Sequence, residues 1–164
     1  MIPPLHPDIA VLQPLLGTWA GRGKGSYPTI ESFEYLEEIT FGHVGKPFLA
    51  YGQRTRHADD NRPLHAETGY WRCHTAGGQN VVEVVLAHPT GIVEVQQGPF
   101  DGRVFDLASV QLGATPTAKN VTQVVRRFEL VGDELRYTVA MAAVGQPLTH
   151  HLEAVLLRQA SAAQ

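Results

Sequence analysis

Histidine is the residue type in this chain with the widest range of chemistry. The 164 residues include eight histidines, and two of them, His150 and His151, are adjacent. Neighbouring residues on a strand point to opposite faces, so a regular strand cannot turn both rings toward one metal ion. The other six histidines show no paired spacing typical of zinc ligands. The sequence therefore gives little support for a zinc site built from protein ligands alone.

Other reactive side chains offer less. Cys73 is the only cysteine, and strand alternation places its neighbour His74 on the other face. The serine-nucleophile pattern Gly-x-Ser-x-Gly is absent, and the glycines near Lys24 lack the spacing of a phosphate-binding loop. The pair Glu37-Glu38 splits across two faces and is interpreted as ordinary strand polarity. Lys119 is by default a solvated loop lysine, and it would pair with a ligand that carries carboxylates at the mouth of a barrel.

Composition excludes several classes of protein. Thirteen Lys+Arg against sixteen Asp+Glu give a net charge of -3, which argues against binding to nucleic acid. No apolar run approaches the roughly 18 residues that span a bilayer, and the first residues lack the pattern of a secretory signal. One cysteine excludes an internal disulfide framework. We expect one domain over residues 1–164, a cytoplasmic location and no membrane partner.

The elements that must position these side chains are almost all strands. Only residues 8–16 suggest a helix, with Asp8 as its cap and Gly17 after its end. Elsewhere apolar and polar residues alternate, which predicts antiparallel strands with one dry face; Val93 and Val95 are expected on that face. Turn sequences separate nine or ten such runs, so the sequence predicts an all-β, up-and-down antiparallel barrel.

A barrel of this size implies a cavity. About eight strands already suffice for a packed or one-ligand interior, so ten leave space for a bound small molecule. A lipophile such as a fatty acid is one candidate. Haem is another, because the porphyrin supplies four nitrogens and the iron then needs only one protein ligand, such as a histidine at the rim.

The first strand has a glycine-rich face. Its sequence runs Gly17-Thr18-Trp19-Ala20-Gly21-Arg22-Gly23. A bare face permits sharp bending or the close approach of another group. We expect Trp19 to plug the closed end of the barrel, with its indole stacked under Arg158 of the last strand.

The ordered motifs of the chain closely resemble the nitrobindins, a family of ferric haem-binding β-barrels also described as peroxynitrite isomerases. The resemblance extends from about Leu12 to Arg158. It rests on a set of segments in the same order and at compatible spacing, which are the glycine motif (Gly17, Trp19, Gly21, Gly23), Tyr27–Ile30, Phe33–Glu38, His43–Pro47 and His151-Leu152.

The resemblance implies a ten-stranded barrel akin to the fatty-acid-binding proteins and lipocalins, with a short N-terminal helix and one haem b near the open end. It implies that His151 is the axial ligand of the iron and the catalytic centre, and that Thr29 and Lys119 contact the haem. The expected ligands are nitric oxide and peroxynitrite, and peroxynitrite would isomerise to nitrate. A homodimer is a further possible state of the protein. The alternative is a lipophile carrier without haem chemistry.

Two further expectations concern the surroundings of His151. If Trp19 and Arg158 meet inside the barrel, simple alternation turns His151 outward, so a β-bulge near residues 146–150 or a haem at the rim is required. No distal acid or base is evident in the sequence. We therefore expect an apolar distal side.

Overall fold

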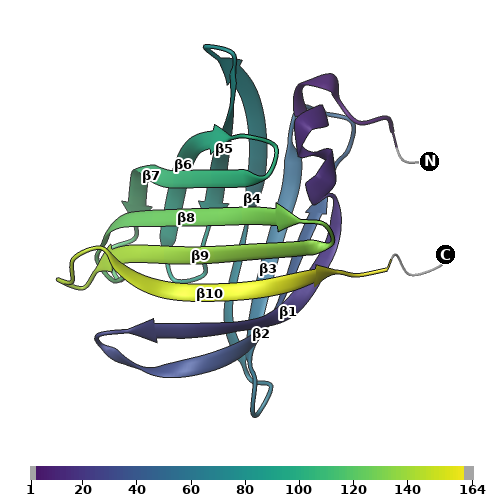
Figure 1. Cartoon of the computed structure of the whole chain (residues 1–164). Coiled ribbons are helices and arrows are strands. Elements are labelled where there is room, and N and C mark those ends of the chain that lie inside the picture. Colours follow the sequence, from purple (N-terminus) through teal and green to yellow (C-terminus); the bar gives the residue numbers. More distant parts are fainter. Residues whose placement is uncertain (1–2, 161–164) are drawn as a thin grey trace.

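The chain folds into a closed antiparallel barrel. The structure is a computed structural model that describes residues 3–160, and Figure 1 shows a short helix beside the strands. Each strand pairs with the next along the chain, and β1 pairs with β10 to close the barrel. The elements are η1 (Pro7–Leu15), β1 (Gly17–Tyr27), β2 (Ile30–Gly42), β3 (Leu49–His57), β4 (Pro63–Ala76), β5 (Gln79–Ala87), β6 (Ile92–Phe100), β7 (Val104–Ala114), β8 (Val121–Val131), β9 (Glu134–Ala143) and β10 (Thr149–Arg158).

The architecture confirms the predicted ten-stranded up-and-down barrel. Glycines with positive φ lie in the turns where the sequence indicated them, as at Gly77, Gly102 and Gly132. No helix within residues 3–160 is long and apolar enough to cross a membrane.

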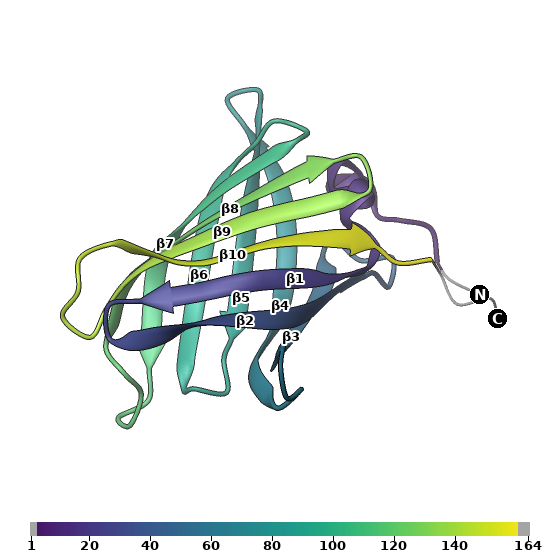
Figure 2. The same cartoon turned by 60° about the horizontal axis from the view of Figure 1, so that its bottom comes forward.

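The two ends of the barrel differ. Figure 2 shows η1 at one end, near the end of β10, and the β1–β2 turn with the β9–β10 connection at the other. We call the first the closed end and the second the open end. Three apolar side chains of η1, Ile9, Leu12 and Leu15, are fully buried. The helix therefore acts as a plug.

The N-terminal helix differs in detail from the prediction. It is a 3₁₀ helix whose cap is His6, because the His6 side chain accepts a hydrogen bond from the Asp8 amide at 3.2 Å. Asp8 is thus inside the first turn and is not the cap. Pro14 lies within the helix and lacks an amide hydrogen, which is consistent with a short, irregular element.

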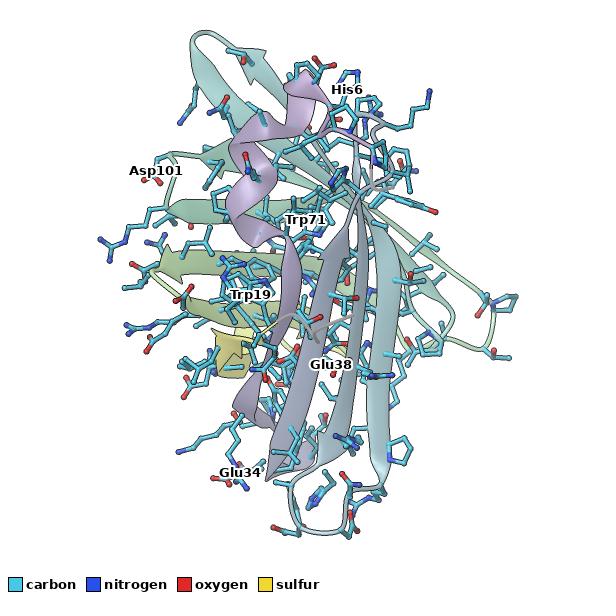
Figure 3. The ribbon with its side chains drawn as sticks, turned by 90° about the vertical axis from the view of Figure 1, so that its right-hand side faces the viewer. His6, Trp19, Glu34, Glu38, Trp71 and Asp101 are labelled. Carbon is cyan, nitrogen blue, oxygen red and sulfur yellow. The ribbon has the colours of Figure 1, made fainter. Side chains whose placement is uncertain are left out.

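Trp19 and Arg158 fasten the closed end as predicted. The guanidinium carbon of Arg158 lies 4.2 Å from the centre of the Trp19 ring, and the indole donates a hydrogen bond to the Leu15 carbonyl at 2.8 Å. Arg158 also donates to the carbonyls of Leu16 and Pro14 at 2.7 and 2.8 Å. Figure 3 looks onto this end, with η1 in front and Trp19 beside it.

The glycine face of β1 points into the barrel and is filled by its neighbours. A Cβ atom on Gly21 would lie 2.2 Å from the Val155 carbonyl oxygen of β10, and one on Gly23 would lie 2.2 Å from the Tyr35 ring of β2. The glycine motif is therefore structural. It lets β10 and Tyr35 approach the backbone of β1.

One strand has the opposite face inward from the one expected. On β6, Glu94 and Gln96 are buried, whereas Val93 is exposed at 51%. The residues of β6 alternate between the two faces as predicted, but the valines do not form the inner face. The reason lies across the lumen, where Arg126 of β8 forms an ion pair with Glu94.

Candidate functional site at the open end

His151 lies at a β-bulge near the start of β10. The pairing of β10 with β9 shifts register between His150 and Leu152, so His151 has no partner on β9. This places a bulge one residue beyond the segment in which the sequence required one. The extra residue lets Leu152, Ala154 and Leu156 keep their inward or partly buried positions while the His151 side chain is also partly buried.

Contacts with β1 fix the orientation of the His151 ring. Nδ1 lies 3.1 Å from the Ser26 carbonyl oxygen, and the ring meets that of Tyr27 edge to face with centroids 5.4 Å apart. Because a carbonyl oxygen only accepts hydrogen bonds, Nδ1 carries the hydrogen. The lone pair is then on Nε2, which has no hydrogen-bond partner within the described part of the chain. This is the tautomer in which histidine binds a metal through Nε2.

Burial favours the neutral form of this imidazole. Removal from water lowers the pKa of His151, a hydrogen bond to Ser26 opposes this effect, and the charges of His150, His65 and Arg126 lower the pKa further. The adjacent His150 is different, because it is exposed and lies 3.5 Å from Glu153 on the outer surface. The two rings point to different sides, as the sequence predicted, and only His151 is available to the interior.

The structure places the other two predicted residues at the same end. Thr29 is in the turn between β1 and β2, two residues from Tyr27, and Lys119 is in the loop between β7 and β8. Both are exposed. Lys119 forms no ion pair with any residue from 3 to 160, so its charge is free for an anionic group.

Apolar surface is open to solvent around this mouth. Five side chains are only partly buried where they pack on the core, and they lie in the halves of their strands that lead to the open end: Phe33, Leu112, Val121, Met141 and Leu152. Of these side chains, Phe33 also borders an open hollow of about 610 Å³, but the other lining residues of this hollow include the outward-facing Lys24, Glu34 and His150, so it is not the lumen of the barrel. A free imidazole nitrogen, an apolar rim and a free cation fit the iron, the ring and the carboxylates of haem.

The lumen below the mouth is polar, contrary to expectation. Glu37 is buried, and it accepts hydrogen bonds from the hydroxyl of Tyr137 at 2.5 Å and from Gln53 at 2.9 Å. Burial raises the pKa of Glu37 to about 7 even though both hydrogen bonds lower it. Glu38 points outward to Arg54. The pair does split across two faces, but Glu37 is not ordinary strand polarity.

A second cluster is centred on Arg126. Its guanidinium donates to both carboxylate oxygens of Glu67, at 2.8 and 3.1 Å, and to Glu94 at 3.0 Å. Tyr51 donates to Glu67 at 2.7 Å. Burial opposes ionisation of Glu67 and Glu94, but the charge of Arg126 outweighs it, so the pKa of each carboxyl is below its usual value.

Two histidines complete this cluster. Nε2 of His65 lies 3.1 Å from Nδ1 of His88, and Nε2 of His88 lies 2.8 Å from Glu94. Both histidines belong to the open end, at the start of β4 and just after β5. The sequence analysis therefore missed these acids and bases of the lumen, whereas the expectation of an apolar distal side stays a prediction. The pattern His65-Ala66-Glu67 could have indicated part of this cluster, because residues two apart on a strand share a face and these two side chains therefore lie together.

Comparisons with known proteins identify similar chains. Residues 8–158 match the family described as THAP4-like, heme-binding beta-barrel domain. A protein named peroxynitrite isomerase 1 from Mycolicibacterium paratuberculosis is 57% identical over 159 residues, which cover 94% of this chain and 97% of that protein. A peroxynitrite isomerase from Nocardia farcinica is 57% identical over 158 residues, or 94% and 92% of the two chains.

A solved structure is also similar. The crystal structure of Rv2717c from M. tuberculosis has a TM-score of 0.88 and 52% sequence identity, and the match covers 96% of this chain and 100% of that one. The likeness therefore extends over the whole barrel, including both of its ends.

Proposed function

Because the chain belongs to the THAP4-like haem-binding β-barrel family, with haem as its cofactor, we propose that it isomerises peroxynitrite to nitrate with haem b held by His151. The observation that carries this proposal is the His151 ring, whose Nδ1 faces the Ser26 carbonyl while Nε2 is free. Relatives that are 57% identical over most of their length bear the name peroxynitrite isomerase, which supports the choice of reaction.

The chain's own residues would bind and orient the cofactor. The Ser26 carbonyl holds the ring of His151, and Tyr27 packs against its edge, so Nε2 is presented in one direction. The apolar rim would cover the porphyrin faces and exclude water. Lys119 and Thr29 lie at the mouth, where a cation and a hydroxyl would bind the haem carboxylates.

Haem held by His151 would supply an iron that binds a small nitrogen oxide and acts on it as a Lewis acid. Peroxynitrite and nitrate have the same atoms and the same charge, so no separate oxidant or reductant is required. We propose nitric oxide as a second ligand of the same iron. The cytoplasmic location, one haem per chain and the homodimer also stand as predictions from the sequence.

The buried charges favour haem chemistry over the carriage of a fatty acid. A carrier of this kind needs a free cation in the lumen for the fatty-acid carboxylate. In the described part of the chain, Arg126 is the buried cation of the lumen, and Glu67 and Glu94 already occupy it.

The test compares His151→Ala with His150→Ala after reconstitution with hemin. We expect a sharp Soret band in the wild type and in His150→Ala, and its loss in His151→Ala, because only His151 presents a free nitrogen inward. In stopped-flow measurements, peroxynitrite decay should accelerate in proportion to haem-loaded protein. An unchanged Soret band in His151→Ala would remove this residue as the ligand, and equal decay with haem-free protein would leave a binder without turnover.

A further inference from the structure

Three side chains in the lumen bring their ligand atoms together. His65 and Glu67 are two residues apart on β4, and His88 directly follows β5, the strand paired with β4. Nε2 of His65 and Nδ1 of His88 are 3.1 Å apart, and Oε2 of Glu67 lies 3.8 Å from the first and 3.5 Å from the second. All three atoms lie within 4.8 Å of one another.

We propose that His65, Glu67 and His88 bind one divalent transition-metal ion, for which zinc is the best match. Zinc binds histidine nitrogen and carboxylate oxygen at about 2.0–2.2 Å in tetrahedral geometry, which separates neighbouring ligand atoms by about 3.3–3.6 Å. The three distances observed here bracket that spacing. Two histidines and one glutamate form a ligand set that leaves the fourth position open.

The neighbours of these residues hold the ligands as the second layer of a metal site does. Nε2 of His88 lies 2.8 Å from Glu94 without the geometry of a hydrogen bond, and the negative charge of this carboxylate favours a hydrogen on Nε2 and the lone pair on Nδ1. Glu67 is held by the hydroxyl of Tyr51 at Oε1 and by Arg126 at both carboxylate oxygens. The present hydrogen bond between the two histidines needs one hydrogen between them. The ion would take the place of that hydrogen, which would then lie on Nδ1 of His65 so that Nε2 has a lone pair for the metal.

Charge in the cluster also favours a cation. Glu67 and Glu94 are buried carboxylates, and within residues 3–160 Arg126 is the one guanidinium that contacts both. The two carboxylates therefore share a single guanidinium. His65 is one-third exposed, whereas the side chains of His88 and Glu67 are at most 7% exposed, so an ion would enter past His65.

The site is separate from the haem ligand of the proposed function. His151 is on β10, and four strand-to-strand steps around the barrel separate β10 from β4. The inference does not depend on the haem chemistry, and each can fail without the other.

The test measures zinc in haem-loaded protein that has been stripped with a chelator, dialysed against zinc and then freed of excess ion. We expect about one zinc per chain by elemental analysis, with an unchanged Soret band. His65→Asn should weaken zinc binding at least tenfold in competition with a chromophoric chelator. The matched control is His74→Asn, a substitution on the same strand of an exposed histidine that faces Glu83 outside the barrel.

Glu94→Gln gives a second measure, because it leaves the three ligands in place. We expect a roughly 10- to 100-fold loss of zinc affinity, as for other groups that orient a metal-bound histidine. Less than one zinc in ten wild-type chains would overturn the proposal, whatever the variants do. Equal affinity in wild type and a folded His65→Asn, or loss of the Soret band as zinc binds, would also overturn it.

Discussion

At the scale of single residues, Glu37 makes stability depend on pH. Its pKa is about 7 in the folded barrel against an ordinary value of 4.5, because it is buried. The folded state therefore holds this proton more tightly than the unfolded state. The resulting stabilisation is full below pH 4.5 and is lost as the pH rises through about 7, by at most about 3 kcal/mol. Glu37→Gln should remove this loss, as measured by urea unfolding at pH 5 and pH 8.

The adjacent glutamate provides the control for this prediction. Glu38 is on the outer face of β2 and pairs with Arg54. Glu38→Gln should retain the wild-type change in unfolding free energy between the two pH values. A Glu37→Gln protein with the same pH dependence as the wild type would show that Glu37 is not the group responsible.

The sequence predicted residues best where local pattern decides the outcome. The conflict between an inward Arg158 and strand alternation predicted either a bulge near residues 146–150 or a haem at the rim, and the structure has a bulge at His151. Trp19 contacts Arg158 as expected. The polar lumen did not follow. Arg126 is 59 residues from Glu67 and 32 from Glu94, so nothing near any of them in the sequence indicates their pairing.

At the scale of elements, the close approach of β1 and β10 depends on glycine. A Cβ atom on Gly21 would lie 2.2 Å from a backbone oxygen of β10, which cannot rotate away as a side chain can. Gly21→Ala should therefore destabilise the fold by roughly 1–3 kcal/mol, since the strands must separate. Thermal unfolding with circular dichroism would measure this change.

A second glycine provides the control, because its replacement shows what the loss of a glycine costs where no neighbouring strand is in close contact. Gly42 ends β2, has no atom within 4 Å of an added Cβ and lacks a positive φ. Gly42→Ala should change the unfolding free energy by less than about 0.5 kcal/mol. If both variants melted at the wild-type temperature, β1 and β10 would not be in the tight contact described here.

The order of the strands was predictable because turn sequences mark where each strand ends. Which face of a strand points into the barrel was not always predictable. In β6, Val93-Glu94-Val95-Gln96 alternates with a period of two, which fits either face equally. Hydrophobicity favours the valines as the inner pair. The buried ion pair of Glu94 with Arg126 requires the other choice, and it depends on a partner strand that the local pattern does not include.

At the scale of the whole molecule, the contacts that stabilise the closed end of the barrel are separate from the proposed haem site at the open end. Arg158 joins η1, β1 and β10 at the closed end, and His151 lies toward the open end of the same strand. Arg158→Met keeps much of the side-chain bulk but removes two hydrogen bonds to carbonyls, the ion pair with Asp133 at 3.1 Å and the contact of its charge with Trp19. We expect a loss of about 2 kcal/mol, or a melting temperature lower by about 4–8 °C.

The loss of stability in Arg158→Met should not be accompanied by a loss of hemin affinity. Sites that share no partners usually contribute independently, so Arg158→Met should bind hemin with an affinity within about twofold of wild type at temperatures where it is folded. Arg136→Met is the matched control, because Arg136 is half-exposed and pairs only with Glu134 among the described residues. It should change neither quantity. A fall in hemin affinity in Arg158→Met alone would mean that the plug at one end sets the geometry of His151 at the other.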